Sequence, residues 1–326
     1  MTIEFPGLFD LQVNGFAGVD FNAPDLGAEE AGRALAGMRS TGVTQCLPTL
    51  ITSSLAAFQR NAAMLAALAD PAVAGLHMEG PYISPEDGPR GAHPRDHVRP
   101  ASLDDFKRRQ EAAAGRIVLV TLAPEVPDVL PLVEYLVEND VRVAIGHTAA
   151  TPAQIADTLA AGATLATHLG NGCAAMLPRH PNVIWELLAA DEVSASLIVD
   201  GHHLPPATVK ALVRAKGIER TLLVTDAIAA AGCAPGPYRI GGADCVLDEN
   251  GRVGLPGTPY LAGSALTLDR AIANTVRFTG LALETVVRMA STLPAACIGR
   301  EPRGVVKAEW DSELSELRIA AVRTNL

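Results

Sequence analysis

The chain has 326 residues, of which 48% are hydrophobic, 19% charged and 4% aromatic. This composition is typical of a globular enzyme and excludes a disordered protein, and the length fits one large domain because single α/β domains reach ~250 residues. The formal net charge is −10, and Lys and Arg form no basic stripe, so we expect no nucleic-acid partner.

The N-terminal residues Met1–Pro6 lack the basic and apolar regions of a secretory signal, and no stretch of ~18 apolar residues indicates a membrane span. The five cysteines are odd in number and show no CxxC spacing, which is typical of a reducing compartment rather than of a disulfide framework. We therefore expect a cytoplasmic protein with no membrane partner.

Short apolar runs alternate with Ala- and Leu-rich segments of helical composition, which is typical of repeated βα units around a parallel sheet. Eight such runs are predicted as strands: Leu8–Val13, Val43–Thr49, Gly75–Met78, Ile117–Ala123, Arg142–Gly146, Thr164–His168, Ala195–Val199 and Leu222–Thr225. The predicted crossover helices include Glu29–Arg39, Ser54–Ala69, Asp128–Glu138 and Pro152–Ala160. Eight units favour closure, so the pattern predicts an α/β fold of the (β/α)₈ barrel type.

The pattern changes after Asp226. Residues 232–257 are rich in Gly and Pro and contain the β-like piece Asp244–Leu247, so we expect a small β-like excursion at about 232–260. Helical composition resumes at Ser264–Phe278 and Ala282–Met289, and a β-like run, Leu317–Val322, lies near the C-terminus.

Ionisable side chains collect at one end of the predicted strands. Those within or just after the C-terminal ends of the runs are Asp10, Glu79, His147, His168, Asp200 and Asp226. In a (β/α)₈ barrel these ends form the catalytic face.

Three of these residues predict a metal site. Glu79 ends the third run, and His147 and His168 end the fifth and sixth. Taken singly, the carboxylate could cap a helix or form an ion pair, and each imidazole could be a core histidine. Together they make a set of two histidines and one carboxylate, which holds one divalent metal and leaves positions open for water and substrate. The set favours zinc, with iron, cobalt or manganese as alternatives.

Asp226 ends the eighth run and is the predicted base for the hydrolytic water, although a buried carboxylate there could instead bond the next helix. His93 and His203 lie in loops on the same face, where both could donate hydrogen bonds to a substrate. We interpret His202 as structural because adjacent loop residues rarely share one role.

These residues, in this order, resemble the N-acetylglucosamine-6-phosphate deacetylases of the amidohydrolase superfamily. The similarity runs from Pro6 to about Gly299. The motifs that carry it are Pro6-Gly-Leu-Phe-Asp-Leu-Gln-Val-Asn-Gly15, His77-Met-Glu-Gly-Pro81, Gly146-His-Thr148, Thr167-His-Leu169, Asp200-Gly-His-His203, Val224-Thr-Asp-Ala227 and Leu261-Ala-Gly-Ser-Ala-Leu-Thr267.

The resemblance implies that Asp226 acts first as general base and then as general acid to the departing amine, and that His93 polarises the acetyl carbonyl. Members of the family carry either a His-x-His pair for a second metal or Gln-x-Asn on the first strand. This chain has Gln12 and Asn14, so it is similar to the single-metal type, and amides are poor zinc ligands.

The resemblance also implies a phosphate site and a homodimer. Asn171, the backbone N–H of Gly172 and His203 occupy the family's phosphate-binding positions, together with Arg179, which in the family reaches in from a neighbouring subunit. A guanidinium is suited to bidentate binding of phosphate.

The chain departs from the family at three places. Gly172-Cys173 stands where Ala-Met is usual, only Met1–Phe5 precede the first barrel motif, and the tail reads Lys307-Ala-Glu-Trp-Asp-Ser-Glu-Leu314 instead of the usual Ala-Asp-Leu-Val run. We therefore expect residues 6–300 to form the barrel. Residues 1–5 and 301–326 are expected to be the remnant of a much reduced accessory β-sandwich.

The leading hypothesis is metal-dependent hydrolysis of the acetamide of an N-acetyl amino-sugar phosphate, N-acetylglucosamine 6-phosphate above all, to glucosamine 6-phosphate and acetate. The enzymatic alternative is a related amidohydrolase that acts on another N-acyl or cyclic amide, with or without a phosphate group, and the Gly172-Cys173 segment motivates it. A barrel that binds a sugar without catalysis is the third hypothesis, and the metal set with its base argues against it.

Overall fold

The computed structural model, which describes residues 1–324, contains a barrel of eight parallel strands, and the predicted fold class is confirmed. The strands are β2 (Leu8–Val13), β5 (Val43–Ile51), β6 (Leu76–Glu79), β7 (Ile117–Leu122), β8 (Arg142–Ile145), β9 (Leu165–Ala166), β10 (Ser194–Leu197) and β11 (Thr221–Leu223). Each pairs with the next in chain order, and a parallel bridge between Val13 and Ala227 joins the first strand to the segment that follows the last. The sheet therefore closes on itself.

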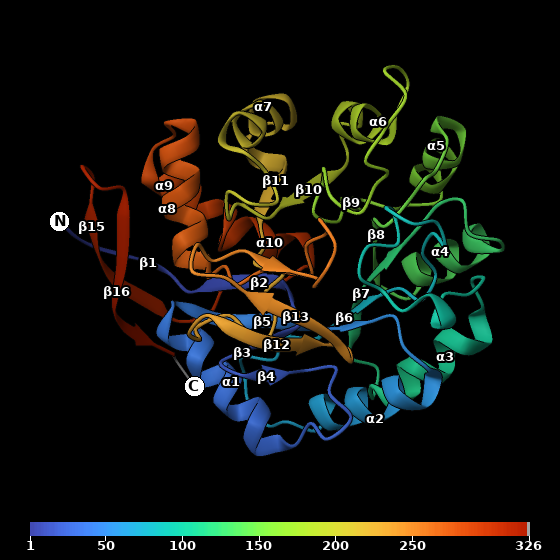
Figure 1. Cartoon of the computed structure of the whole chain (residues 1–326), viewed down its shortest axis with the longest axis horizontal. Helices are drawn as coiled ribbons and strands as arrows, with labels where there is room; N and C mark the ends of the chain where they lie inside the picture. Colours follow the sequence, from blue (N-terminus) through green and yellow to red (C-terminus); the bar gives the residue numbers. More distant parts are fainter. Residues whose placement is uncertain (325–326) are drawn as a thin grey trace.

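Helices surround the strands (Figure 1). They are α1 (Ala28–Ser40), α2 (Leu55–Ala66), α3 (Leu103–Ala112), α4 (Val129–Glu138), α5 (Pro152–Ala160), α6 (Val183–Ala189), α7 (Pro206–Lys216), α8 (Leu268–Thr279), α9 (Leu283–Met289) and α10 (Thr292–Cys297), with short 3₁₀ turns η1 (Arg95–His97) and η2 (Ile218–Arg220). Local sequence explains the start of α5, where Thr151 and Gln154 form a capping box around Pro152. Among residues 1–324, no helix is long and apolar enough to span a membrane.

Five strands end earlier than the sequence predicts, and two of them, β7 and β10, end at Leu122 and Leu197 where the runs Ile117–Ala123 and Ala195–Val199 are predicted. The predicted runs Arg142–Gly146, Thr164–His168 and Leu222–Thr225 correspond to the other three, β8, β9 and β11, which end at Ile145, Ala166 and Leu223. The reason for these three is backbone geometry just beyond them, because His147, His168 and Asp226 have φ angles of 51°, 31° and 50°. Residues in this left-handed region leave the extended conformation that a strand requires.

The excursion after Asp226 is a small antiparallel sheet of β12 (Gly236–Ile240), β13 (Ala243–Leu247) and β14 (Val253–Gly254). It has its own apolar cluster, which includes Ile240 and Leu247 and packs on Ile51 at the end of β5. The Gly241 N–H donates to Asp20 Oδ2 at 2.8 Å, next to the short hairpin of β3 (Gly15–Phe16) and β4 (Val19–Asp20). The excursion is thereby anchored close to the mouth of the barrel.

The two ends of the chain meet in a second antiparallel sheet. Strand β1 (Thr2–Pro6) pairs with β15 (Val305–Asp311), and β15 pairs with β16 (Glu316–Arg323). Figure 1 shows these strands at the side of the barrel, next to α1 and α8. Phe5 and Trp310 are buried there, so the sheet continues the main core.

A buried carboxylate supports barrel closure. Asp10 on β2 is fully buried, and its side chain accepts hydrogen bonds from Thr225 Oγ1 at 2.5 Å, from the Thr225 N–H at 3.2 Å and from the Gln12 N–H at 3.2 Å. It therefore joins the first strand to the residue that immediately precedes Asp226.

We expect the substitution Asp10→Asn to change the pH dependence of stability. Burial raises the pKa of Asp10 from 3.8 to about 7, so between about pH 4 and pH 7 this carboxyl ionises in the unfolded chain while it stays protonated in the folded one. Ionisation of Asp10 in the unfolded chain then lowers the free energy of unfolding of the wild type by up to about 1.4 kcal/mol per pH unit. The Asp10→Asn variant cannot ionise at this position, so its free energy of unfolding does not fall for this reason.

Urea denaturation at pH 5 and pH 7 measures this effect. The difference in unfolding free energy between variant and wild type should move in favour of the variant at the higher pH. The exposed Asp157→Asn serves as control and should show no such change. An Asp10→Asn difference that is equal at both pH values would contradict the expectation.

Candidate active site

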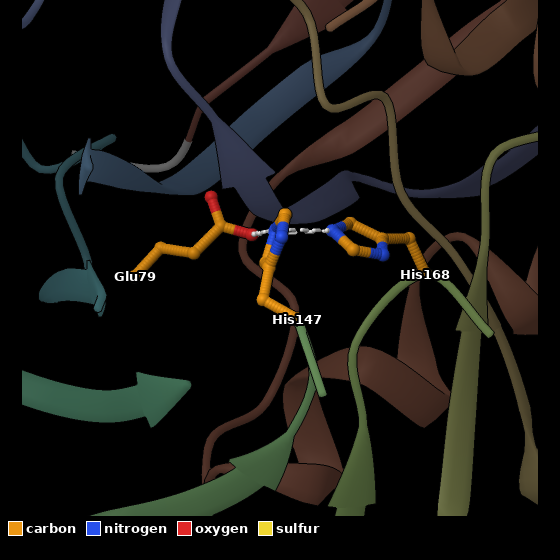
Figure 2. Close-up of side chains that lie close together, drawn as sticks. All are labelled: Glu79, His147 and His168. Atoms are coloured by element: carbon orange, nitrogen blue, oxygen red, sulfur yellow. Dashed lines mark hydrogen bonds and ion pairs between the residues drawn. The ribbon is translucent and has the colours of Figure 1, made fainter. Parts of the chain in front are cut away.

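Three side chains converge at the mouth of the barrel, from β6 and from the ends of β8 and β9 (Figure 2). Glu79 Oε1 lies 3.1 Å from His147 Nε2 and 3.2 Å from His168 Nε2, and the two imidazole nitrogens are 3.1 Å apart. All three side chains are buried, with exposed fractions of 7% or less. These are the three residues that the sequence indicates as metal ligands.

The orientation of the imidazoles fits a shared cation. His147 Nδ1 donates to the Pro89 carbonyl at 2.8 Å, which leaves its Nε2 free to offer a lone pair to the centre. His168 also presents Nε2, and the carboxylate completes a compact group of donor atoms. Two imidazole nitrogens and one carboxylate oxygen are ligands that zinc and similar divalent ions accept.

The charges in this cluster favour a positive centre. Burial alone would raise the pKa of Glu79, but hydrogen bonds from His147 and His168 hold it well below its ordinary range. Burial would likewise lower the pKa of His147, yet the hydrogen bond and charge of Glu79 more than offset this and raise it. The buried carboxylate is thus stabilised as an anion that needs a cationic partner.

The backbone that presents these side chains is strained. A positive φ in a residue other than Gly is uncommon and costs of order 1 kcal/mol, yet it occurs at His147, His168 and Asp226, which follow three different strands. The same turn at each strand end directs the side chain toward the barrel mouth. Such strain persists only where the surrounding structure holds it in place, and it tends to cluster at functional sites.

Asp226 lies beside the cluster and is held by the amides of the first strand. Its Oδ1 accepts from Asn14 Nδ2 at 2.7 Å and from Gln12 Nε2 at 3.2 Å, and Gln12 Nε2 also donates to Glu79 Oε1 at 2.8 Å. Burial, with the charge of Glu79, raises the pKa of Asp226 to about 6. A carboxylate that titrates near neutrality suits proton transfer. The two amide side chains donate to carboxylates here.

His93 is a neutral imidazole whose position and tautomer make it a hydrogen-bond donor to the site. The Thr52 N–H donates to its Nδ1 at 3.4 Å, and Thr52 Oγ1 lies 2.8 Å from the same nitrogen, so Nε2 carries the proton. That Nε2 is 3.9 Å from Glu79 Oε2. Burial lowers the pKa of His93 to about 3, which keeps the ring neutral.

A cavity of about 480 Å³ opens over the cluster and is lined by Glu79, Asp226 and His93, among others. Its wall also includes Asn171, Gly172 and His203. His203 Nδ1 donates to Asp200 Oδ2 at 2.7 Å, which leaves Nε2 free to face a ligand. The neighbouring His202 differs, because its Nε2 lies 3.1 Å from the Asn250 carbonyl in the excursion.

Arg179 is not brought to this cavity. It is exposed, and its carbonyl accepts a hydrogen bond from Trp185 Nε1 at 3.3 Å. Two large apolar side chains close to it in sequence, Met176 and Trp185, are 90% and 52% exposed. The segment that carries Arg179 therefore lies on the outside of this chain and exposes two large apolar side chains.

Sequence reasoning missed several parts of the site. Thr52, which fixes the tautomer of His93, follows β5 at the catalytic end and could have been found by the same strand-end rule. The Pro89 carbonyl that orients His147 has no sequence signal, because every residue has a carbonyl. Ile240 and Tyr260 bring the excursion to the cavity wall, and only the fold shows that they reach it.

Comparison with known proteins is consistent with this geometry. The pattern of the amidohydrolase family matches residues 3–312. The chain is 33% identical to N-acetylglucosamine-6-phosphate deacetylase of Lysinibacillus sphaericus (94% of this chain, 79% of that protein). It is also 33% identical to N-acetylgalactosamine-6-phosphate deacetylase of Escherichia coli O157:H7 (90% and 78%).

Among solved structures, a variant of N-acetyl-D-glucosamine-6-phosphate deacetylase from Mycobacterium smegmatis in complex with N-acetyl-D-glucosamine-6-phosphate superimposes with a TM-score of 0.91 at 31% identity. The match covers 99% of this chain and 86% of that one.

We expect Gly172→Ala to weaken metal binding. A Cβ atom at Gly172 would lie 3.1 Å from His147 Nδ1 and 3.1 Å from His168 Cε1, so the methyl group must displace one imidazole. Displaced ligands typically cost ~10-fold or more in metal affinity. Competition with a chromogenic chelator measures the dissociation constant.

Gly280→Ala is the matched control. Gly280 has a similar positive φ of 77°, but a Cβ there meets nothing within 4 Å, so it carries the backbone cost without the contact. Equal metal affinity in both variants would show that the close approach of Gly172 does not hold the two imidazoles in place.

Proposed function

Since the chain belongs to the amidohydrolase family and, within it, to the N-acetylglucosamine-6-phosphate deacetylases, we propose that it hydrolyses the acetamide of an N-acetyl amino-sugar phosphate. The proposed reaction converts N-acetylglucosamine 6-phosphate to glucosamine 6-phosphate and acetate. The observation that carries the proposal is the convergence of Glu79, His147 and His168 with Asp226 beside them at the floor of one cavity.

Glu79, His147 and His168 are the proposed ligands of one divalent metal, for which the donor set favours zinc. When bound, such an ion supplies Lewis-acid chemistry, because it lowers the pKa of water and polarises a carbonyl. The fixed Nδ1–H of His147 and the hydrogen bond from Gln12 to Glu79 keep two of these side chains oriented for this role.

Asp226 is the proposed general base and acid. It removes a proton from the attacking water as the water oxygen bonds to the acetyl carbon, and the carbonyl π pair moves onto oxygen. His93 donates from Nε2 to that oxygen. Asp226 then gives the proton to nitrogen, the C–N bond breaks with its electron pair on nitrogen, and acetate and the free amine leave.

Phosphate recognition is proposed for the part of the cavity wall that Asn171, Gly172 and His203 form. His203 presents its free Nε2, and Asn171 and the backbone N–H of Gly172 lie on the same wall. Arg179 of the partner subunit would add a bidentate contact across a homodimer interface. The exposure of Met176 and Trp185 supports such an interface, because large apolar side chains are enriched where proteins associate.

Two further parts of the proposal concern the whole chain. We assign residues 6–300 to the catalytic barrel and the two ends to a reduced accessory β-structure. We also propose a cytoplasmic location, on the basis of the scattered cysteines.

We expect Asp226→Asn to keep its metal and to lose nearly all turnover. Asn cannot take a proton from water or give one to the amine, and loss of a general acid and base costs at least ~100-fold in kcat. Acetate release and metal content are measured on the same preparation, with Asp157→Asn as the exposed control. Activity close to wild type in Asp226→Asn would rule out this base.

Substrate competition tests the phosphate site. We expect N-acetylglucosamine 6-phosphate to have a kcat/KM at least ~100-fold above that of the unphosphorylated sugar, since a charge-assisted phosphate contact contributes several kcal/mol. Arg179→Ala should raise KM only for the phosphorylated sugar. Mixing Arg179→Ala with Asp226→Asn chains should restore activity, because a mixed dimer then contains one complete site.

The opposite result favours the second candidate function. Gly172 and Cys173 line the cavity, where they would meet the substrate. A small residue and a thiol at these positions are compatible with a different N-acyl amide as the substrate. Equal kcat/KM for the phosphorylated and unphosphorylated sugars would support that alternative. Absence of any metal-dependent acyl release would instead indicate a barrel that only binds a ligand.

A further inference from the structure

Asn14 has an unpaired polar atom at the catalytic cavity. The residue is 1% exposed and lines the cavity wall directly after β2. Its backbone is fully engaged, because its N–H donates to the Ala227 carbonyl and its carbonyl accepts from the Phe21 N–H. Only the side chain is free to face the cavity.

The orientation of the Asn14 amide follows from its neighbour. Asp226 Oδ1 lies 2.7 Å away and, as an ionised carboxylate oxygen, it can only accept, so the side-chain nitrogen of Asn14 must point toward it. The side-chain oxygen Oδ1 is therefore the remaining atom. It is buried and has no hydrogen-bond partner among residues 1–324.

A buried carbonyl oxygen without a donor costs of order 1–3 kcal/mol, so its persistence calls for a partner that the protein alone does not supply. The neighbouring amide side chain, that of Gln12 on β2, has no such buried, unpaired oxygen among residues 1–324. Gln12 donates to Glu79 and Asp226 but does not line the cavity. The open acceptor thus belongs to Asn14, the one of the two amide side chains whose residue lines the cavity.

The reaction provides the matching donor. An acetamide nitrogen carries one hydrogen, and it becomes tetrahedral when water adds to the carbonyl carbon. Its lone pair must then turn toward the acid, Asp226, and its hydrogen must point elsewhere. The two polar atoms of an amide are about 2.2 Å apart, so Asn14 Oδ1 lies close to the same carboxylate that donates the proton.

We propose that Asn14 Oδ1 accepts a hydrogen bond from the N–H of the scissile amide and so makes the site selective for amides over esters. This inference rests on the proposed function. The hydrogen stays on nitrogen throughout, while the proton from Asp226 adds to the lone pair and the C–N bond breaks. An ester has a lone pair where the amide has this hydrogen, so Asn14 gives an ester no such assistance.

The test compares a matched pair of substrates, N-acetylglucosamine 6-phosphate and glucose 6-phosphate acetylated at O2. We expect Asn14→Ala to lower kcat/KM for the amide about 10- to 100-fold more than for the ester, mainly through kcat. Gln12→Ala is the matched control. It also removes an amide donor from Asp226, so it should lower both rates to a similar extent and leave their ratio unchanged.

The outcomes separate this inference from the function on which it rests. Wild-type protein that hydrolyses the amide, with an amide-to-ester ratio that Asn14→Ala leaves unchanged, contradicts the role of Asn14 alone. Wild-type protein that does not hydrolyse the amide contradicts the proposed function and this inference together. If Asn14→Ala does not fold, Asn14→Leu, which keeps the volume and removes the acceptor, gives the same comparison.

Discussion

One buried carboxylate determines how the rest of this molecule is arranged. Glu79 is 2% exposed, and an ionised carboxylate at such depth costs several kcal/mol unless positive or hydrogen-bonding groups surround it. Its partners, Gln12, His147 and His168, come from the first strand and from the ends of β8 and β9. Only a closed barrel brings these distant segments together, so closure and the active site are one structural requirement.

Closure also links the ionisable groups to one another. Asp10 joins β2 to Thr225, and the next residue, Asp226, is held by the two amides of the same β2 segment. The seam between the first and last strands is therefore where the proposed proton carrier is positioned. The left-handed backbone at Asp226 places its side chain at this seam, beside the proposed metal ligands.

Much of this arrangement was predictable from the sequence, because it depends on the alternation of apolar runs with helical segments and on the polar residues that end those runs. Apolar runs marked the eight strands, and polar residues at their ends marked Glu79, His147 and His168. The extent of β9 was not predictable, since the backbone conformation of His168 overrides its strand-like sequence. Nor was the hydrogen bond from His147 to the Pro89 carbonyl, because main-chain acceptors have no residue signature.

The walls of the cavity and its floor are encoded by different parts of the chain. The floor comes from strand ends that the core holds fixed, whereas the walls come from the loop before α6 and from the segment beyond β14, where Tyr260 is half exposed. Exchange of the exposed segment around Tyr260 need not disturb the residues below it, whereas the loop before α6 is tied to them through Gly172, which lies against His147 and His168. This separation gives the scaffold a route to diversify: substrate preference can drift, or be engineered, while the hydrolytic chemistry is inherited unchanged.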